Sequence, residues 1–431
     1  MTYEMSKKEL TKHHIIKMAC DGQLTVAQAA ARLNLGDRRI KQLKKAFRRD
    51  GPAAFIHGNR KRTSSKRIHP DIVNAILALR KDDVLEKANF THFHEILTQR
   101  YQMTISYSAL YRILKTNGFD SPKSRRRKKV MHPTRERKPA FGVMLQADGS
   151  PHDWLGIGEK WTLHGFIDDA TSRVTGLYLC KNECLLGYNE VLRQTLTRFG
   201  IPQSLYPDMF SVFFVNEKRN PPTIEEQLAG YEKRLTQFGR IIEHLGIDMF
   251  PARSPQAKGR IERLWNTLQQ RLPVEMQLAG IKTMADANTF LSAYLERFNE
   301  QFGVPPKESW SGFVPLPAHY DLDRLLCVEF ERSLSHGSTI SIQGKQFLIK
   351  QNQFPAKTKV TVLIDEKNGL RASIHGHFFP ILPLGDKPEN KASNWAVVLT
   401  DLVQHYLLQD AKRMPPSAAT TRQGVKYSRD S

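Results

Sequence analysis

Three acidic residues stand where they could hold divalent cations together. Asp148 and Asp208 each end a predicted strand, and Glu262 lies on the helix that follows the last strand of the same region. Hard cations take oxygen ligands, and two-metal phosphoryl transfer needs several carboxylates that converge from separate elements. The three residues therefore predict a site for two Mg²⁺ or Mn²⁺ ions that carries out phosphoryl transfer.

Three other aspartates are alternatives for these positions. Asp168 and Asp169 end the strand predicted at 161–169, so they compete with Asp208 for the second position. Asp153 lies beyond the first strand in a polar loop and competes with Asp148. The residues alone leave these alternatives open.

The helix of Glu262 is predicted from its apolar spacing. Ser254 followed by proline is typical of a helix start. Five apolar residues then recur at helical spacing and define a buried stripe; they are Ile261, Leu264, Trp265, Leu268 and Leu272. Glu262 lies at the margin of that stripe, where a lone glutamate is most often a solvated surface charge.

The elements around the acids alternate between strand and helix. Strands are predicted at 143–148, 161–169, 174–179, 204–208 and 247–250, with a helix at 185–199 and the Glu262 helix last. This order predicts a mixed α/β core. From about Leu325, short strands separated by glycines predict a small antiparallel barrel.

The positive charge is concentrated in the first third of the chain. Residues 1–140 hold 32 Lys and Arg against 12 Asp and Glu, whereas the remaining residues hold 33 against 31. Lysine and arginine bind polyanions by neutralising phosphates and releasing counterions. We expect this region to bind double-stranded DNA.

Two helical units are predicted in the basic third. Residues 25–33 and 38–47 form two helices around the turn Leu35–Asp37, which matches a helix-turn-helix. A second, similar unit runs from about His69 to Phe119, and basic linkers that track the phosphate backbone follow each unit. The predicted DNA contacts are Arg38, Arg39, Lys41, Gln42 and Lys45 in the first unit, Arg112 and Lys115 in the second, and Arg125, Arg126 and Arg127 in the linker.

The order of elements and the three acids resemble the catalytic core of DDE transposases and retroviral integrases. Residues 254–268 are similar to the last motif of that family, in which a proline-glutamine pair and a glycine precede the catalytic glutamate. The chain as a whole, over about 7–385, resembles bacterial insertion-sequence transposases of the ISNCY type. The resemblance implies an RNase H-like core, a terminal SH3-like barrel and a metal-binding triad of Asp148, Asp208 and Glu262. It also implies that Lys258 and Arg260 hold the DNA end.

Two features of the chain depart from the family pattern. Between Asp208 and Glu262 lie 53 residues, more than the family core usually has, and an insertion at about 216–233 accounts for the excess. The second acid is followed by Met209, Phe210 and Ser211 rather than by asparagine and glycine.

The predicted organisation and function follow from these observations. The expected parts are helix-turn-helix units at 1–58 and 59–120, a basic linker at 121–140, the catalytic core at 141–310, the barrel at 325–385 and a disordered tail at 410–431. We expect a cytoplasmic, nucleoid-associated bacterial transposase that works as a homo-oligomer on DNA, with no membrane segment. The alternative is a helix-turn-helix regulator with an inactive integrase-like core.

Overall fold

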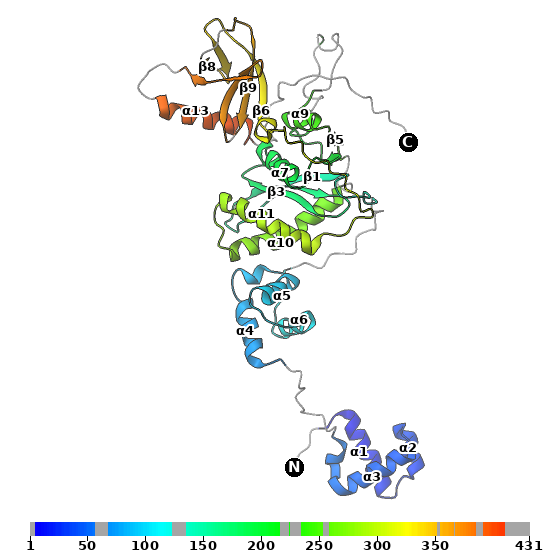
Figure 1. Cartoon of the computed structure of the whole chain (residues 1–431). Helices are drawn as coiled ribbons and strands as arrows, with labels where there is room; N and C mark the ends of the chain where they lie inside the picture. Colours follow the sequence, from blue (N-terminus) through cyan, green and yellow to red (C-terminus); the bar gives the residue numbers. More distant parts are fainter. Residues whose placement is uncertain are drawn as a thin grey trace. The chain divides into compact units, whose positions relative to one another are not determined.

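The structure is a computed structural model of the chain (Figure 1). It describes residues 5–56, 68–122, 135–215, 224, 234–252, 258–350, 354–365, 367–384 and 391–409, with the backbone alone for 391–397. The predicted insertion (apart from Ile224), Arg125–Arg127 and the predicted tail lie outside the described residues. The chain divides into two compact units, Met1–Leu79 and Arg80–Ser431, which are described separately.

The first unit is helical. Its helices are α1 (Lys7–Cys20), α2 (Val26–Leu33), α3 (Asp37–Asp50) and most of α4 (Pro70–Arg80), with a short 3-10 turn at Gly51–Phe55. Thr25 and Gln28 form a capping box at the start of α2, which satisfies backbone N–H groups of its first turn. Ile40 and Leu43 are buried with Ile16 of α1. The two helices predicted at 25–33 and 38–47 are thus confirmed.

The second unit contains a mixed five-stranded sheet. Its strands are β1 (Leu145–His152), β2 (Trp161–Asp168), β3 (Val174–Cys180), β4 (Ser204–Tyr206) and β5 (Asp248–Met249), in the order β3-β2-β1-β4-β5. The first three pair antiparallel, whereas β4 pairs parallel with β1 and β5. This sheet confirms the predicted mixed α/β core.

The position of Asp148 within β1 differs from the prediction. The strand was expected to end at Asp148, but β1 continues to His152 because its pairing with β2 continues that far. On the other side, pairing with β4 stops at Gln146. Asp148 therefore lies within β1, on an edge that β4 leaves open.

Helices cover both faces of the sheet. In Figure 1, α10 (Gly259–Leu278) and α11 (Met284–Phe302) lie on one face, and α7 (Leu185–Arg198) and α9 (Gln237–His244) lie on the other. The predicted apolar stripe of α10 is confirmed, because all five of its residues are buried. The helix begins at Gly259 with Lys258 at its N-cap position and continues through Pro273, and the predicted N-cap Ser254 lies outside the described residues.

Two further helices of this unit precede the sheet in the chain, and the first of them contacts α10. These are α5 (Phe90–Gln99) and α6 (Tyr107–Thr116), preceded by a 3-10 turn at Leu85–Lys87 and capped by Asn89 and by the predicted Ser106. Glu95 of α5 accepts two hydrogen bonds of 2.7 Å from Arg271, and His92 lies 2.8 Å from Glu275. Polar side chains thus join α5 to the second half of α10.

The C-terminal part of the chain is mostly β-structure. After α12 (Leu322–Leu325), it contains a sheet ordered β11-β10-β9-β6 and a sheet ordered β12-β8-β7. The strands are β6 (Val328–Ser333), β7 (Thr339–Ile342), β8 (Lys345–Ile349), β9 (Lys359–Asp365), β10 (Gly369–Ile374), β11 (His377–Phe379) and β12 (Ile381–Pro383). Helix α13 (Lys391–Tyr406), which follows them, was not predicted. In the part of the chain that the structure describes, no helix has the length and apolar character to cross a bilayer.

Candidate catalytic site and DNA interface

Side chains on one face of β1 form hydrogen bonds with residues of α10. Side chains alternate between the two faces of a strand, so Gln146, Asp148 and Ser150 point the same way. Gln146 accepts a hydrogen bond from the backbone N–H of Ile261, and Ser150 accepts one from Gln269. These bonds fix how the N-terminal turns of α10 lie against Asp148.

Asp148 is held by two groups of α10. The ammonium of Lys258 lies 2.7 Å from one carboxylate oxygen, and the indole N–H of Trp265 donates to the other at 2.8 Å. Gly165 is the β2 partner of Asp148, and a Cβ there would come within 2.8 Å of the Trp265 ring. A glycine at 165 therefore leaves the space that lets the indole reach Asp148.

Asp208 lies near the same ammonium. The Lys258 Nζ is 3.9 Å from Asp208 Oδ2, so it bridges the two aspartates that the sequence paired. Asp208 Oδ1 is buried and accepts no hydrogen bond from the described residues. Burial raises the pKa of Asp208, and so does the nearby Asp148 carboxylate, whereas Lys258 lowers it. The structure thus brings Asp148 and Asp208 together on either side of the Lys258 ammonium.

Glu262 lies on the same face of α10 but does not contact the pair. It follows Lys258 by four residues and precedes Trp265 by three, and these spacings place all three on one helix face. Its side chain is exposed and makes no ion pair or hydrogen bond with another described residue. The Glu262 carboxylate thus has no polar partner among the described residues. It lies one helical turn after Lys258, whose ammonium bridges the two aspartates.

The described residues contain no group of three histidine, cysteine or acidic side chains arranged to hold a metal ion. The donor set nevertheless fits a hard cation. Asp148 and Asp208 present carboxylate oxygens on either side of a positive charge, and one buried oxygen of Asp208 lacks a partner among the described residues. Carboxylate oxygens are the ligands that Mg²⁺ and Mn²⁺ prefer.

Glu183 is a fourth acid of this region, which the sequence analysis missed. It comes between β3 and α7 and accepts a hydrogen bond of 2.6 Å from the hydroxyl of Tyr188. Its carboxyl carbon would lie 2.9 Å from a Cβ on Gly149, so it packs beside the residue after Asp148. Burial raises the pKa of Glu183 to about 7, with a further contribution from Asp148 and Asp208. An acid in the short turn between a strand and a helix was the signal that could have found it.

The alternative aspartates are bonded to the surrounding protein. Buried Asp168 accepts hydrogen bonds from the backbone N–H groups of Gly142 and Thr171 and from the Thr171 hydroxyl. Exposed N–H groups of the loop after β1 donate to Asp153. These bonds give Asp168 and Asp153 structural roles in the turns that they belong to.

Asp169 is the centre of a buried ion-pair network. It is fully buried and pairs with Arg135 and, at 2.9 Å, with Arg260. Gln146 and the backbone N–H of Lys138 also donate to it. Arg260, predicted as a DNA contact, is therefore engaged inside the protein together with Asp169, which argues against that prediction.

We expect Asp169→Ala to reduce the free energy of unfolding by about 3–5 kcal/mol, because it leaves buried arginine charge without its partner. Urea unfolding measured by circular dichroism would show the loss. Asp248→Ala, at an exposed strand position, is the matched control, and its effect should stay within about 0.5 kcal/mol. Equal stability of the two variants would contradict the structural role of Asp169.

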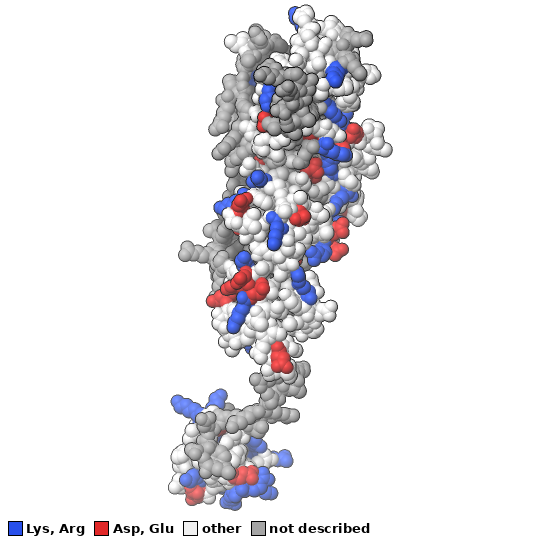
Figure 2. All heavy atoms as spheres, turned by 90° about the vertical axis from the view of Figure 1, so that its left-hand side faces the viewer, with Lys and Arg blue, Asp and Glu red and all other residues white. Residues whose placement is uncertain are grey.

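The predicted DNA contacts of the first unit share one surface of α3. Arg38, Arg39, Lys41, Gln42 and Lys45 are all exposed. Four of them line one shallow hollow, and Arg39 donates to Gln42 at its edge. Figure 2 shows lysine and arginine side chains on this unit. On α6, Arg112 is exposed and Lys115 forms an ion pair with Asp120.

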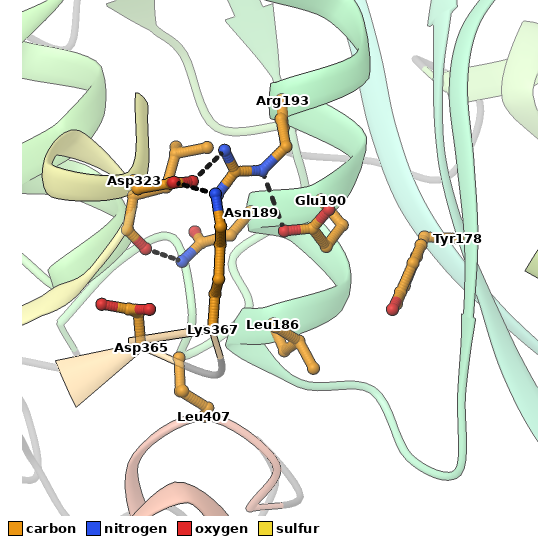
Figure 3. A pocket seen from close by; sticks show the side chains of 10 residues that line it. Tyr178, Leu186, Asn189, Glu190, Arg193, Asp323, Asp365, Lys367 and Leu407 are labelled. Atoms are coloured by element: carbon orange, nitrogen blue, oxygen red, sulfur yellow. Dashed lines mark hydrogen bonds and ion pairs between the residues drawn. The ribbon is translucent and has the colours of Figure 1, made fainter. Parts of the chain in front are cut away.

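A separate cavity of about 430 Å³ lies between α7 and the C-terminal β-structure (Figure 3). Arg193 of α7 pairs with Glu190 and Asp323, and Lys367 pairs with Asp323 as well. Ion pairs thus join the two parts across this cavity, and Asp365, which also lines it, pairs with Arg371. None of the residues that the sequence predicts as metal ligands or DNA contacts lines this cavity.

Two transposases resemble the chain over most of its length. It is 34% identical to the transposase for insertion sequence IS1202 of Streptococcus pneumoniae over 390 residues, which is 82% of each protein. It is 32% identical to the transposase y4bF of Sinorhizobium fredii over 353 residues, 81% of this chain and 74% of that protein. No protein-family model matches the chain.

Solved structures resemble it only weakly. The HTLV-2 integrase catalytic core in complex with magnesium shares 16% identity, with a TM-score of 0.26 over 38% of this chain and 88% of that chain. A structural similarity this weak does not assign the chain to a family. The family is shown by the two transposases that are 34% and 32% identical to the chain. The chain belongs to the transposases of bacterial insertion sequences.

Proposed function

We propose that the chain cleaves DNA strands at the ends of its insertion sequence and joins them to target DNA, with Asp148, Asp208 and Glu262 as ligands of two divalent cations. The observation that carries this proposal is the position of Asp148 and Asp208 on either side of one ammonium. Glu262 adds a carboxylate on the same face of α10, one turn beyond Lys258.

The cations, when bound, would activate the attacking oxygen and offset charge on the leaving oxygen. The protein positions their ligands on rigid elements. Asp148 is fixed within β1 by Trp265, and Glu262 is carried by a helix whose apolar stripe is buried. Beyond Gln146 the edge of β1 is not paired with β4, and a DNA strand would lie beside Asp148 there.

We further propose that α2 and α3 act as a helix-turn-helix that reads the ends of the element. Groove-reading helices present basic and amide side chains to base edges and phosphates. The five side chains predicted as DNA contacts on α3 are all exposed. Because two ends must be brought together, the active form on DNA would be a homo-oligomer. The C-terminal β-structure is proposed as an SH3-like barrel.

Strand transfer with labelled element ends tests the catalytic proposal. The purified chain is expected to cleave and join these ends with Mg²⁺ or Mn²⁺ and to do neither with EDTA. Binding of the ends without cleavage under any metal would instead favour the alternative, a regulator with an inactive core.

The same assay identifies the second acid. Asp208→Asn should abolish strand transfer while the protein stays folded, whereas Asp168→Asn should act through stability, because its oxygens are bonded within the core. A folded Asp168→Asn protein without activity, beside an active Asp208→Asn protein, would reverse the assignment.

A further inference from the structure

Lys258 has an unusual position for a lysine in a DNA-binding protein. Its side chain is only 8% exposed, and its ammonium lies between two carboxylates rather than in solvent. A buried ammonium is costly unless it is paired. Lys258 therefore lies in the interior of the site, although it occupies the N-cap position of the helix that carries Glu262.

The two aspartates need a positive charge between them. Carboxylates held close together repel one another, and this repulsion is strongest where water is excluded. The Lys258 ammonium supplies one positive charge at 2.7 Å from Asp148 and 3.9 Å from Asp208. Asp208 is the less completely bonded of the two aspartates, because its buried Oδ1 has no hydrogen-bond donor among the described residues.

We propose that the Lys258 ammonium takes the place of a divalent cation between Asp148 and Asp208, and that the two exchange when the site is loaded. The inference rests on the proposed function, because it takes the two aspartates as cation ligands. A divalent cation and an ammonium cannot share the space between the same oxygens, since the two positive charges repel. The lysine thus keeps the aspartates together before loading and competes with the metal for them.

Binding of Mn²⁺ to the full-length chain, measured from the electron paramagnetic resonance signal of the free ion, tests this exchange. Lys258→Met removes the competitor, so the dissociation constant for Mn²⁺ should fall at least about tenfold. Lys282→Met, at an exposed lysine in the turn after α10, should leave it unchanged. In EDTA, Lys258→Met should also lower the thermal midpoint, and saturating Mn²⁺ should remove most of that difference. A lysine with a merely structural role would lower the midpoint equally with and without metal.

The wild-type chain gives a readout that does not depend on the variant folding. Acetylation of Lys258, followed by mass spectrometry, should be slow in EDTA and faster with Mg²⁺, whereas acetylation of Lys282 should not change. Unchanged protection of Lys258 with bound metal would overturn the exchange.

The outcomes separate the two proposals. If wild type binds Mn²⁺, Asp148→Asn abolishes binding and Lys258→Met binds no more tightly, then the exchange is wrong and the metal site stands. If neither wild type nor Lys258→Met binds Mn²⁺, both the exchange and the proposed metal chemistry fail.

Discussion

Glu262→Gln is expected to slow end cleavage and strand transfer on the order of 10³-fold, while binding of the element ends stays within about twofold of wild type. The substitution keeps the size of the side chain and removes only its charge and its capacity to bind a cation with both oxygens. Because Glu262 is exposed and its side chain makes no hydrogen bond or ion pair with the described residues, folding should be unaffected. Single-turnover strand transfer in Mg²⁺, with a gel-shift assay of end binding, measures both quantities.

Glu300→Gln is the matched control for Glu262→Gln. Glu300 is an exposed glutamate on α11, a neighbouring helix, and its loss should change neither rate nor binding. If Glu262→Gln retained the wild-type rate, Glu262 would be the solvated surface charge that its exposure alone suggests. A loss of rate together with a loss of end binding would instead indicate a role in holding DNA.

The local features of this site were predictable from sequence. The apolar spacing of α10 predicted its buried stripe because helical periodicity depends on the residues of the helix itself. The same holds for α2 and α3, whose predicted inward residues Ile40 and Leu43 are buried. Asp148 and Asp208 were paired by their places after apolar runs, and the structure brings them to one ammonium.

The tertiary contacts that pair each basic side chain of the site with its acidic partner were not predictable from the sequence. Lys258 and Arg260 look alike in sequence, two basic residues beside a glycine, yet one bridges the aspartates and the other pairs with Asp169. Each partner lies on a distant strand or at its end, so spacing along the chain carries no signal for it. The role of Gly165 was hidden for the same reason, because it depends on the ring of Trp265, which is far away in the sequence.

Local errors also had physical causes. The end of β1 was placed at Asp148 because an acid interrupts an apolar run, but an antiparallel partner continues the pairing to His152. Glu183 was missed because it lies three residues beyond the end of β3, and its place beside Gly149 depends on the tertiary fold.

Replacing Arg38, Lys41 and Lys45 together with alanine is expected to weaken binding of the element ends at least about 100-fold at 0.1 M salt. The three side chains are exposed on one surface of α3 and line a shared hollow, so the variant removes charge without disturbing the buried side of the helix. For every phosphate that is no longer neutralised, the slope of log K against log salt should become shallower by about 0.9. Fluorescence anisotropy with labelled ends across a salt series measures affinity and slope.

A triple alanine variant of Lys7, Lys8 and Lys12 separates a specific surface from general charge. It removes three exposed positive charges from the same unit, but from α1 rather than α3. If α3 contacts the DNA, the α1 variant should bind almost as tightly as wild type and keep its preference for element ends over unrelated DNA. Equally weakened binding in both variants would mean that the unit attracts DNA by net charge alone. A disappearance of end preference in the α3 variant alone would show that α3 reads the sequence of the ends, since phosphate contacts alone carry no sequence information.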